Sequence, residues 1–358
     1  MSRSADKKGR SKKFTPVGII FAVLGLLLFA YFVKKAGVAE IVEGIRRLGA
    51  GFLLVLVISG IRPVVRTLAW TRCLEGPHHL RFRDAFRAYL VGDAMGTLLP
   101  LGIIVSEPAK AALVRERVPL VVGLSALAIE NIFYSLSVVL FIFCGTAALL
   151  LSFQLPKPLR IASIGALVVT LGVIPLAYFV IRKQWKFLSG ALEYLYGRGL
   201  GRRLFETRRE RVRSLEDRVY GFYTRNQSRF LPILLLEACF HLAGVAEVYV
   251  TLYFIVDLPQ NLLLTAFVLE AVNRVINVVF KFVPMRVGVD EAGTGMLTKI
   301  LRLGTASGVT LAIVRKARVI VWTALGIAFL VRRGLSLRAV AENAEEAVAA
   351  EVVEGATR

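Results

Sequence analysis

Long apolar segments alternate with short charged segments along most of the chain. A helix needs about 20 mostly apolar residues to cross the hydrocarbon core of a bilayer. Six segments meet this condition: Pro16–Val33, Phe52–Trp70, Leu120–Leu151, Leu159–Ile181, Leu231–Val256 and Thr305–Val331. The pattern therefore predicts an all-α polytopic membrane protein.

Two further apolar segments, Ala85–Pro100 and Leu262–Val283, are interrupted by charged side chains. Each runs into a break that contains proline and glycine, LLPLGIIVSEPAK in the first and KFVPMRVGVDEAG in the second. Non-helical backbone at membrane depth is tolerated where it is buried in protein or lines a cavity, as in re-entrant hairpins. We therefore expect two re-entrant broken-helix hairpins, Ala85–Val118 and Leu262–Gly304, in addition to six full spans. The alternative is eight full spans.

The two breaks resemble each other in sequence. Shifted by 184 residues, the first aligns with the second without a gap, and seven of the 30 positions from 100 to 129 are identical. The repeat signatures lie near 85–130 and 262–315. Because three spans separate the hairpins, we expect them to enter from opposite sides. That arrangement is an inverted repeat, which transporters use to build a central site from broken helices.

Charge is distributed between the apolar segments. The chain carries 46 Lys and Arg against 25 Asp and Glu, a formal charge of +21, although 56% of its residues are hydrophobic. Basic residues gather in the N-terminus (1–15), in the connector 182–229 and just before the tail 334–358. The positive-inside rule places these three segments in the cytoplasm and the domain 16–333 in the cytoplasmic (inner) membrane. This distribution argues against nucleic acid and for anionic headgroups of the inner leaflet as partners.

The sequence contains no motif for a metal, a cofactor or an enzymatic reaction. Cys73, Cys144 and Cys239 have no metal-like spacing. A membrane transferase would require carboxylates or a metal site clustered on one aqueous side, and the chain offers no such cluster. We therefore expect a protein that is not an enzyme and that has no cofactor.

Polar side chains inside the apolar segments are the candidate functional residues, because burying them is costly unless they face a polar cavity or a partner. The candidates for a lipid headgroup site or polar cavity are Glu107, Lys110, Glu291, Arg315, Arg274, Arg62, Arg66, Glu130, Asn131, Glu247, Asn273 and Asn277. Their alternative role is a set of structural ion pairs that fix helix packing. The expected helix breaks are at Pro100, Gly102, Pro284 and Gly288.

Two pairs of candidates have a spacing that suggests a role. Arg62 and Arg66 lie four residues apart, on one helix face, and a planar guanidinium fits phosphate. Glu237 and His241 also share a face, as the two members of a proton relay would. A simple packed hydrogen bond gives the same spacing.

The segment LLPLGIIVSEPAKAALV resembles the first signature of the lysylphosphatidylglycerol synthase transmembrane-region family, whose members are flippase-like membrane proteins. In that signature a proline and a Gly-rich turn precede a glutamate and a base, and FKFVPMRVGVDEAG resembles the second signature. The likeness covers residues 16 to 333. The matching residues are Pro100, Gly102, Glu107 and Lys110 in the first half and Pro284, Gly288, Glu291 and Arg315 in the second.

Three features refine this resemblance. Family members often have Glu-Arg where this chain has Glu130 and Asn131, so the first half lacks the base that Arg315 supplies in the second. The segment GVAEVYVTLYFI, with Glu247, resembles the branch associated with hopanoid transport. The tail 334–358 is too short for the soluble aminoacyl-transferase domain of the bifunctional members, so we do not expect lipid lysylation.

The resemblance implies a flippase that moves an amphipathic lipid between the two leaflets. A headgroup needs a polar path while its tails stay in lipid, and two opposed hairpins with Glu and Arg would provide one. Two alternatives from other classes stay open: a membrane-embedded transferase acting on a lipid-linked sugar, and an accessory subunit of lipid synthesis. The expected partners are membrane lipids, and a homodimer is compatible with the sequence.

Overall fold

A computed structural model describes residues 27–98, 102–183, 190, 194, 213, 216–257, 261–281, 283 and 286–332. Every regular element among these residues is a helix, so the expected all-α class is confirmed. The helices are α2 (Val38–Leu48), α3 (Gly51–Cys73), α4 (Phe82–Leu98), α5 (Gly102–Ala112), α6 (Leu120–Ser152), α7 (Lys157–Lys183), α10 (Gln227–Ile255), α11 (Leu262–Val279), α12 (Val289–Ile300) and α13 (Thr305–Arg332).

Five of these helices are long and apolar enough to cross a membrane: α3, α6, α10, α11 and the part of α7 from Lys157 to Leu176. Four of them contain spans that the hydrophobic pattern predicts. The protein is therefore a polytopic helical membrane protein. The first expected span, Pro16–Val33, lies largely outside the described residues, as do the N-terminus, most of the connector 182–229 and the tail.

Helices α11 and α13 differ from the expectation. At 18 residues, or about 27 Å, α11 is by itself long enough to cross the hydrocarbon core, although we expected only one arm of a hairpin there. Helix α13 has 28 residues but does not qualify as apolar, because Arg315, Lys316 and Arg318 lie within four positions of each other. These basic side chains turn to the interior of the bundle, as described below.

The two sequence breaks separate α4 from α5 and α11 from α12. Pro100 and Pro284 lie outside the described residues, and Gly102 is the first residue of α5. Gly288 directly precedes α12 with φ +82°, in the left-handed region that favours glycine. Its backbone N–H donates to the Glu291 carboxylate at 2.8 Å, so Glu291 caps the helix that follows the break.

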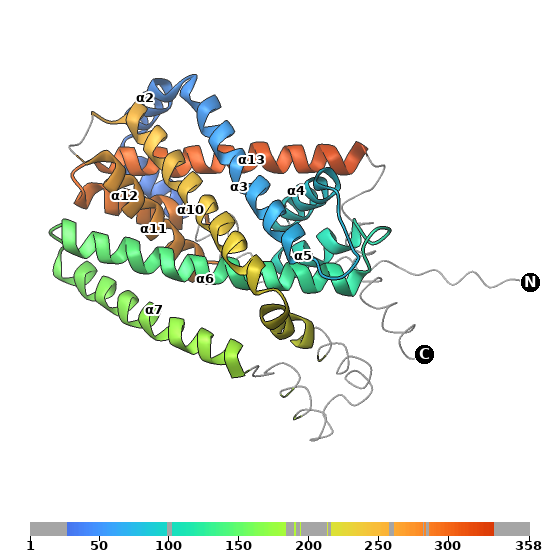
Figure 1. Cartoon of the computed structure of the whole chain (residues 1–358). Coiled ribbons are helices and arrows are strands. Elements are labelled where there is room, and N and C mark those ends of the chain that lie inside the picture. Colours follow the sequence, from blue (N-terminus) through green and yellow to red (C-terminus); the bar gives the residue numbers. More distant parts are fainter. Residues whose placement is uncertain are drawn as a thin grey trace, which may run out of the picture.

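The α4–α5 and α11–α12 pairs lie at opposite ends of the long helices (Figure 1). Helix α13 connects these ends, and a glycine permits close packing at each. A Cβ at Gly308 would lie 2.5 Å from the Thr294 carbonyl of α12, and one at Gly326 would lie 2.4 Å from the Leu90 carbonyl of α4. This opposed placement is the one that an inverted repeat predicts.

Each repeat packs against the other one. Helix α6 of the first repeat meets α11 of the second, where a Cβ at Gly145 would lie 2.0 Å from Ala271 Cβ. Helix α13 of the second repeat meets α4 of the first, and α3 and α10 cross in the centre. The middle of the bundle is therefore built from both halves of the chain.

Candidate functional site

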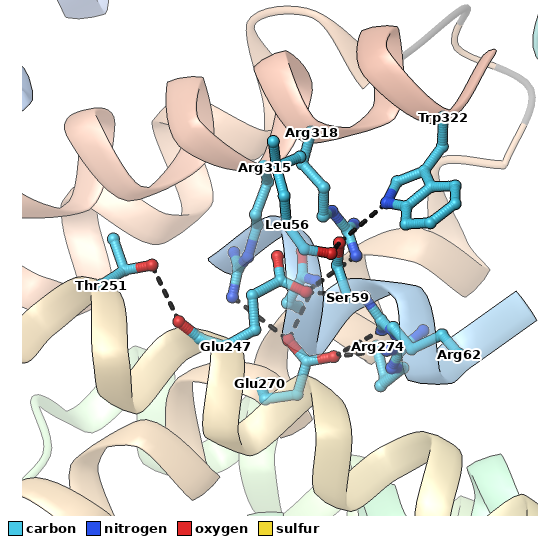
Figure 2. A network of polar contacts seen from close by, with 11 residues as sticks. Leu56, Ser59, Arg62, Glu247, Thr251, Glu270, Arg274, Arg315, Arg318 and Trp322 are labelled. Carbon is cyan, nitrogen blue, oxygen red and sulfur yellow. Dashed lines mark hydrogen bonds and ion pairs between the residues drawn. The ribbon is translucent and has the colours of Figure 1, made fainter. Parts of the chain in front are cut away.

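A buried polar cluster lies where α3 and α10 pack together (Figure 2). We call it the central network. It consists of four arginines and two glutamates on four helices: Arg62 from α3, Glu247 from α10, Glu270 and Arg274 from α11, and Arg315 and Arg318 from α13.

Both glutamates accept from several arginines. One oxygen of Glu247, Oε2, accepts from Arg62 Nη1 at 3.2 Å and from Arg318 Nη1 at 2.8 Å. Glu270 accepts from Arg62 Nη2 at 3.1 Å and from Arg315 Nη2 at 3.3 Å. Arg274, one helical turn along α11, also forms an ion pair with Glu270. Glu270 thus joins three helices of the bundle.

The central network carries more positive than negative charge. Four guanidinium groups face two carboxylates, a formal surplus of +2 among the described residues. The Nε atoms of Arg62, Arg274 and Arg318 have no hydrogen-bond acceptor within the described part of the chain. Arg62 and Arg274 are buried, at 9% and 6% exposed, and Arg318 is partly buried, with 14% of its side chain exposed. An uncompensated charge in such surroundings is costly, so the surplus calls for an anion.

Two uncharged residues on α10 contact the central network: Gly244 leaves space for it, and Phe240 packs against its arginines. A Cβ at Gly244 would lie 2.5 Å from Glu270 Oε1 and 3.2 Å from Arg62 Nη2, so glycine lets the ion pairs approach the helix. The Phe240 ring lies 4.7 Å from Arg62 Cζ and 5.0 Å from Arg274 Cζ. The face of an aromatic ring attracts cations, so Phe240 stabilises both guanidinium groups without changing the net charge.

A second buried cluster lies one turn further along α3. Arg66 donates through Nη2 to Glu130 Oε2 at 2.9 Å and to Asn131 Oδ1 at 3.2 Å, and its Nε also forms an ion pair with Glu130. Helices α6 and α10 pack together at this level, where the Tyr134 ring contacts Phe240 and His241. Glu130, one turn before Tyr134, therefore faces Glu237, one turn before His241. We call Glu130 and Glu237 the carboxylate pair. Both residues are 1% exposed.

Each helix pair contributes a carboxylate just after its break, and each of these carboxylates has a lysine partner. Glu107 accepts from Lys110 Nζ at 2.9 Å, and this ammonium group lies 4.2 Å from the centre of the Tyr89 ring. Glu291 accepts from Lys316 Nζ at 2.5 Å. Glu107 is partly open, with 26% of its side chain exposed, whereas Glu291 is fully enclosed.

Most of the expected site residues therefore come together, but two details differ from the expectation. Arg315, matched to the second signature together with Glu291, bonds instead to Glu270 and reaches Thr294 Oγ1 at 3.5 Å. The next residue, Lys316, points about 100° away around the helix and meets Glu291 instead. The first half was also expected to lack a base beside Glu130. Arg66 of α3 supplies that base. Although residue 131 is an asparagine, the packing of α3 against α6 brings a guanidinium group to Glu130 from another helix.

The remaining amide candidates lie at the edge of the central network. Asn273 Nδ2 is 3.5 Å from Glu270 Oε2, and Asn277 Oδ1 has no donor among the residues that the structure covers. Glu270 is one of the ionisable residues that the sequence places inside the second broken segment, but it was not among the expected site residues, and neither were Lys316 and Gly244. Glu270 could have been found from its spacing of four residues to Arg274, but no local signal marks Lys316 or Gly244.

The geometry of the two clusters fits the recognition of charge. Over the described ranges, no group of three or more His, Cys, Asp or Glu side chains could hold a metal ion. The arrangement can bind an anion at buried guanidinium groups, and it can hold a proton on neighbouring carboxyl groups.

Comparison with known proteins gives one match. A family model described as "Lysylphosphatidylglycerol synthase TM region" matches residues 17–333, which is most of the chain. Neither the curated proteins nor the solved structures contain a significant match.

Proposed function

Because the chain belongs to the lysylphosphatidylglycerol synthase transmembrane-region family and has a function related to membrane lipids, we propose that it moves an amphipathic lipid between the leaflets of the cytoplasmic membrane. In this proposal the protein is a flippase and not an enzyme. The termini and the basic connector lie on the cytoplasmic side, where they meet anionic headgroups.

The surplus of +2 in the central network is the observation that carries the proposal. A lipid with a phosphate group would neutralise part of this charge at mid-bundle. Its acyl chains could stay in the bilayer, because only the headgroup needs a polar path. Guanidinium groups suit this role because their planar donors match phosphate oxygens.

The position of the central network between the repeats supports movement as well as binding. Arg62 comes from the half of the chain that holds the first repeat signature, and its partners Glu247 and Glu270 come from the half that holds the second. A shift of one repeat against the other would therefore rearrange these contacts. Inverted repeats permit such a shift to expose a central site to each side in turn.

Lipid movement by the purified protein tests the proposal. The protein is reconstituted into liposomes that contain phosphatidylglycerol with a fluorescent NBD group on one acyl chain, and dithionite then quenches the probe in the outer leaflet. We expect faster loss of the protected inner-leaflet signal than in protein-free liposomes. Arg318→Gln should slow this movement, whereas Arg47→Gln, a change in an exposed ion pair of α2, should not.

The same preparation separates the alternative functions. A transferase would convert a lipid-linked sugar into a new product that chromatography detects, without moving the probe. An accessory subunit would do neither. A rate equal to that of protein-free liposomes, with correctly folded protein, would refute lipid movement.

A further inference from the structure

We propose that the carboxylate pair, Glu130 and Glu237, holds one exchangeable proton, and that binding and release of this proton drive the lipid movement. The inference rests on the proposed function and adds a proton as the coupling ion. Four observations carry it: the contact between the two carboxyl groups, their charge balance, their surroundings and their link to the central network.

The contact between Glu130 and Glu237 itself requires a proton. Neither carboxylate oxygen of Glu237 has a hydrogen-bond donor in the described residues, although this side chain is buried where α10 packs against α6 and faces Glu130. Ionised carboxylates only accept hydrogen bonds, so two of them can bond only when one carries a proton. Two carboxyl groups that share a buried site hold one proton for this reason.

The charge balance leads to the same conclusion. Arg66 is the base in direct contact with the pair, and it bonds to Glu130 and Asn131. One guanidinium balances one carboxylate, so the second would remain as an unpaired charge in the interior. Both residues are 1% exposed, where an unpaired charge is costly. A proton on the pair makes the cluster neutral.

Among the described residues, no second base bonds to Glu237. The charged or titratable groups around the pair come from five helices: Arg62, Arg66 and Cys73 of α3, Tyr89 of α4, Glu107 and Lys110 of α5, Tyr134 of α6, and His241 of α10. The His241 ring stacks on Phe141, with centroids 4.6 Å apart, and its Nε2 lies 3.0 Å from Ser137 Oγ. Lys110 is bonded to Glu107.

These neighbours also suggest how a proton reaches the pair. Glu107, with 26% of its side chain exposed, is the open end of a polar series that continues through Lys110 to the Tyr89 ring. On the other side of the pair, His241 lies one turn along α10 from Glu237, with Nδ1 unpaired among the described residues. A hydrated proton from one aqueous side forms an O–H bond on a carboxylate, changing its charge from −1 to 0. The proton later returns to water on the other side, and nothing else is consumed.

The link to lipid binding runs along α3. Arg66 is bonded to the carboxylate pair, and Arg62, one turn away, is bonded to both glutamates of the central network. The Phe240 ring lies within 5.9 Å of Arg66 Cζ and 4.7 Å of Arg62 Cζ. Loss of the proton makes the carboxylate pair more negative, so it attracts the Arg66 guanidinium more strongly and α3 with it. Binding of a proton at the carboxylate pair therefore changes the position of Arg62 in the central network.

The test imposes a pH gradient across the liposomes with NBD-phosphatidylglycerol. If one proton moves with each lipid, a gradient of about one pH unit shifts the distribution of the probe between leaflets by up to about tenfold. Glu237→Gln cannot exchange a proton at this position, so its distribution should be the same with and without the gradient. Glu43→Gln, in the exposed ion pair with Arg47, should respond like the wild type.

A second measurement does not depend on transport. Infrared spectra of the wild type at neutral pH should show the carbonyl stretch of a protonated carboxyl group, and Glu237→Gln should reduce it. A wild type that moves lipid but ignores the gradient overturns the inference while the proposed function stands. A wild type that moves no lipid refutes the proposed function, and the infrared band then still tests the shared proton. Absence of the band in the wild type refutes the shared proton.

Discussion

The surplus charge of the central network predicts that removing a carboxylate and removing an arginine have unequal effects. Glu270→Gln takes away the negative partner of Arg62, Arg274 and Arg315 and raises the surplus from +2 to +3. Breaking a buried ion pair by removal of one partner costs about 3–5 kcal/mol. We expect Glu270→Gln to lower the free energy of unfolding by an amount in this range, because Glu270 is 1% exposed and the freed arginines stay enclosed.

Arg318→Gln should be much milder. Glu247 keeps Arg62 at 3.2 Å, and the surplus falls from +2 to +1. The lost bond to a charged group contributes roughly 1.5–3 kcal/mol, but relief of repulsion among the remaining arginines offsets part of it. The net cost should therefore be about 1.5 kcal/mol or less. Transport of the anionic probe should nevertheless fall, since the variant removes one of the groups that attract it.

Thermal unfolding in detergent measures the contrast. A thiol-reactive dye reports unfolding through Cys73, which is 1% exposed, once the exposed Cys144 and Cys239 have been replaced by serine. The melting temperature should fall far more for Glu270→Gln than for Arg318→Gln. Added phosphatidylglycerol should raise it in the wild type and more steeply in Glu270→Gln, because an anion then neutralises a larger surplus. If the two variants lose equal stability and added lipid has no effect, the inference that the surplus positive charge binds an anion is refuted.

Three further predictions concern other parts of the molecule. Gly244→Ala should disrupt the central network, because its Cβ would lie 2.5 Å from Glu270 Oε1, and lipid movement should fall while the Arg47→Gln control stays normal. Glu291→Gln should lower the melting temperature more than Glu107→Gln, because the first carboxylate is enclosed with Lys316 and the second is partly open; normal expression and transport of both variants would remove them from the site. Single cysteines in the connector 182–229 of a Cys-free protein should resist an impermeant thiol reagent in intact cells and react after lysis; labelling in intact cells would reverse the topology.

Four of the spans and the positions of both breaks could be predicted from the sequence alone. The Phe52–Trp70 segment became part of α3, and the break around Gly288 ended one helix and began the next. Both results depend on local properties. A helix satisfies its own backbone hydrogen bonds in lipid, so about 20 apolar residues are enough to specify a span. The sequence also shows which polar side chains lie inside the apolar segments. Most of these candidate residues gather in the two buried clusters.

Only the tertiary structure decided which charges meet. Arg315 and Lys316 are neighbours in sequence, yet they serve Glu270 and Glu291 respectively, because the rotation of α13 about its axis sets the direction of each side chain. Glu130 receives its base from Arg66 on a different helix, 64 residues away in sequence. A glycine is needed at position 244 because the Glu270 carboxylate of α11 approaches α10 there. Pairings of this kind follow from the crossing and close approach of helices, which no local sequence pattern specifies.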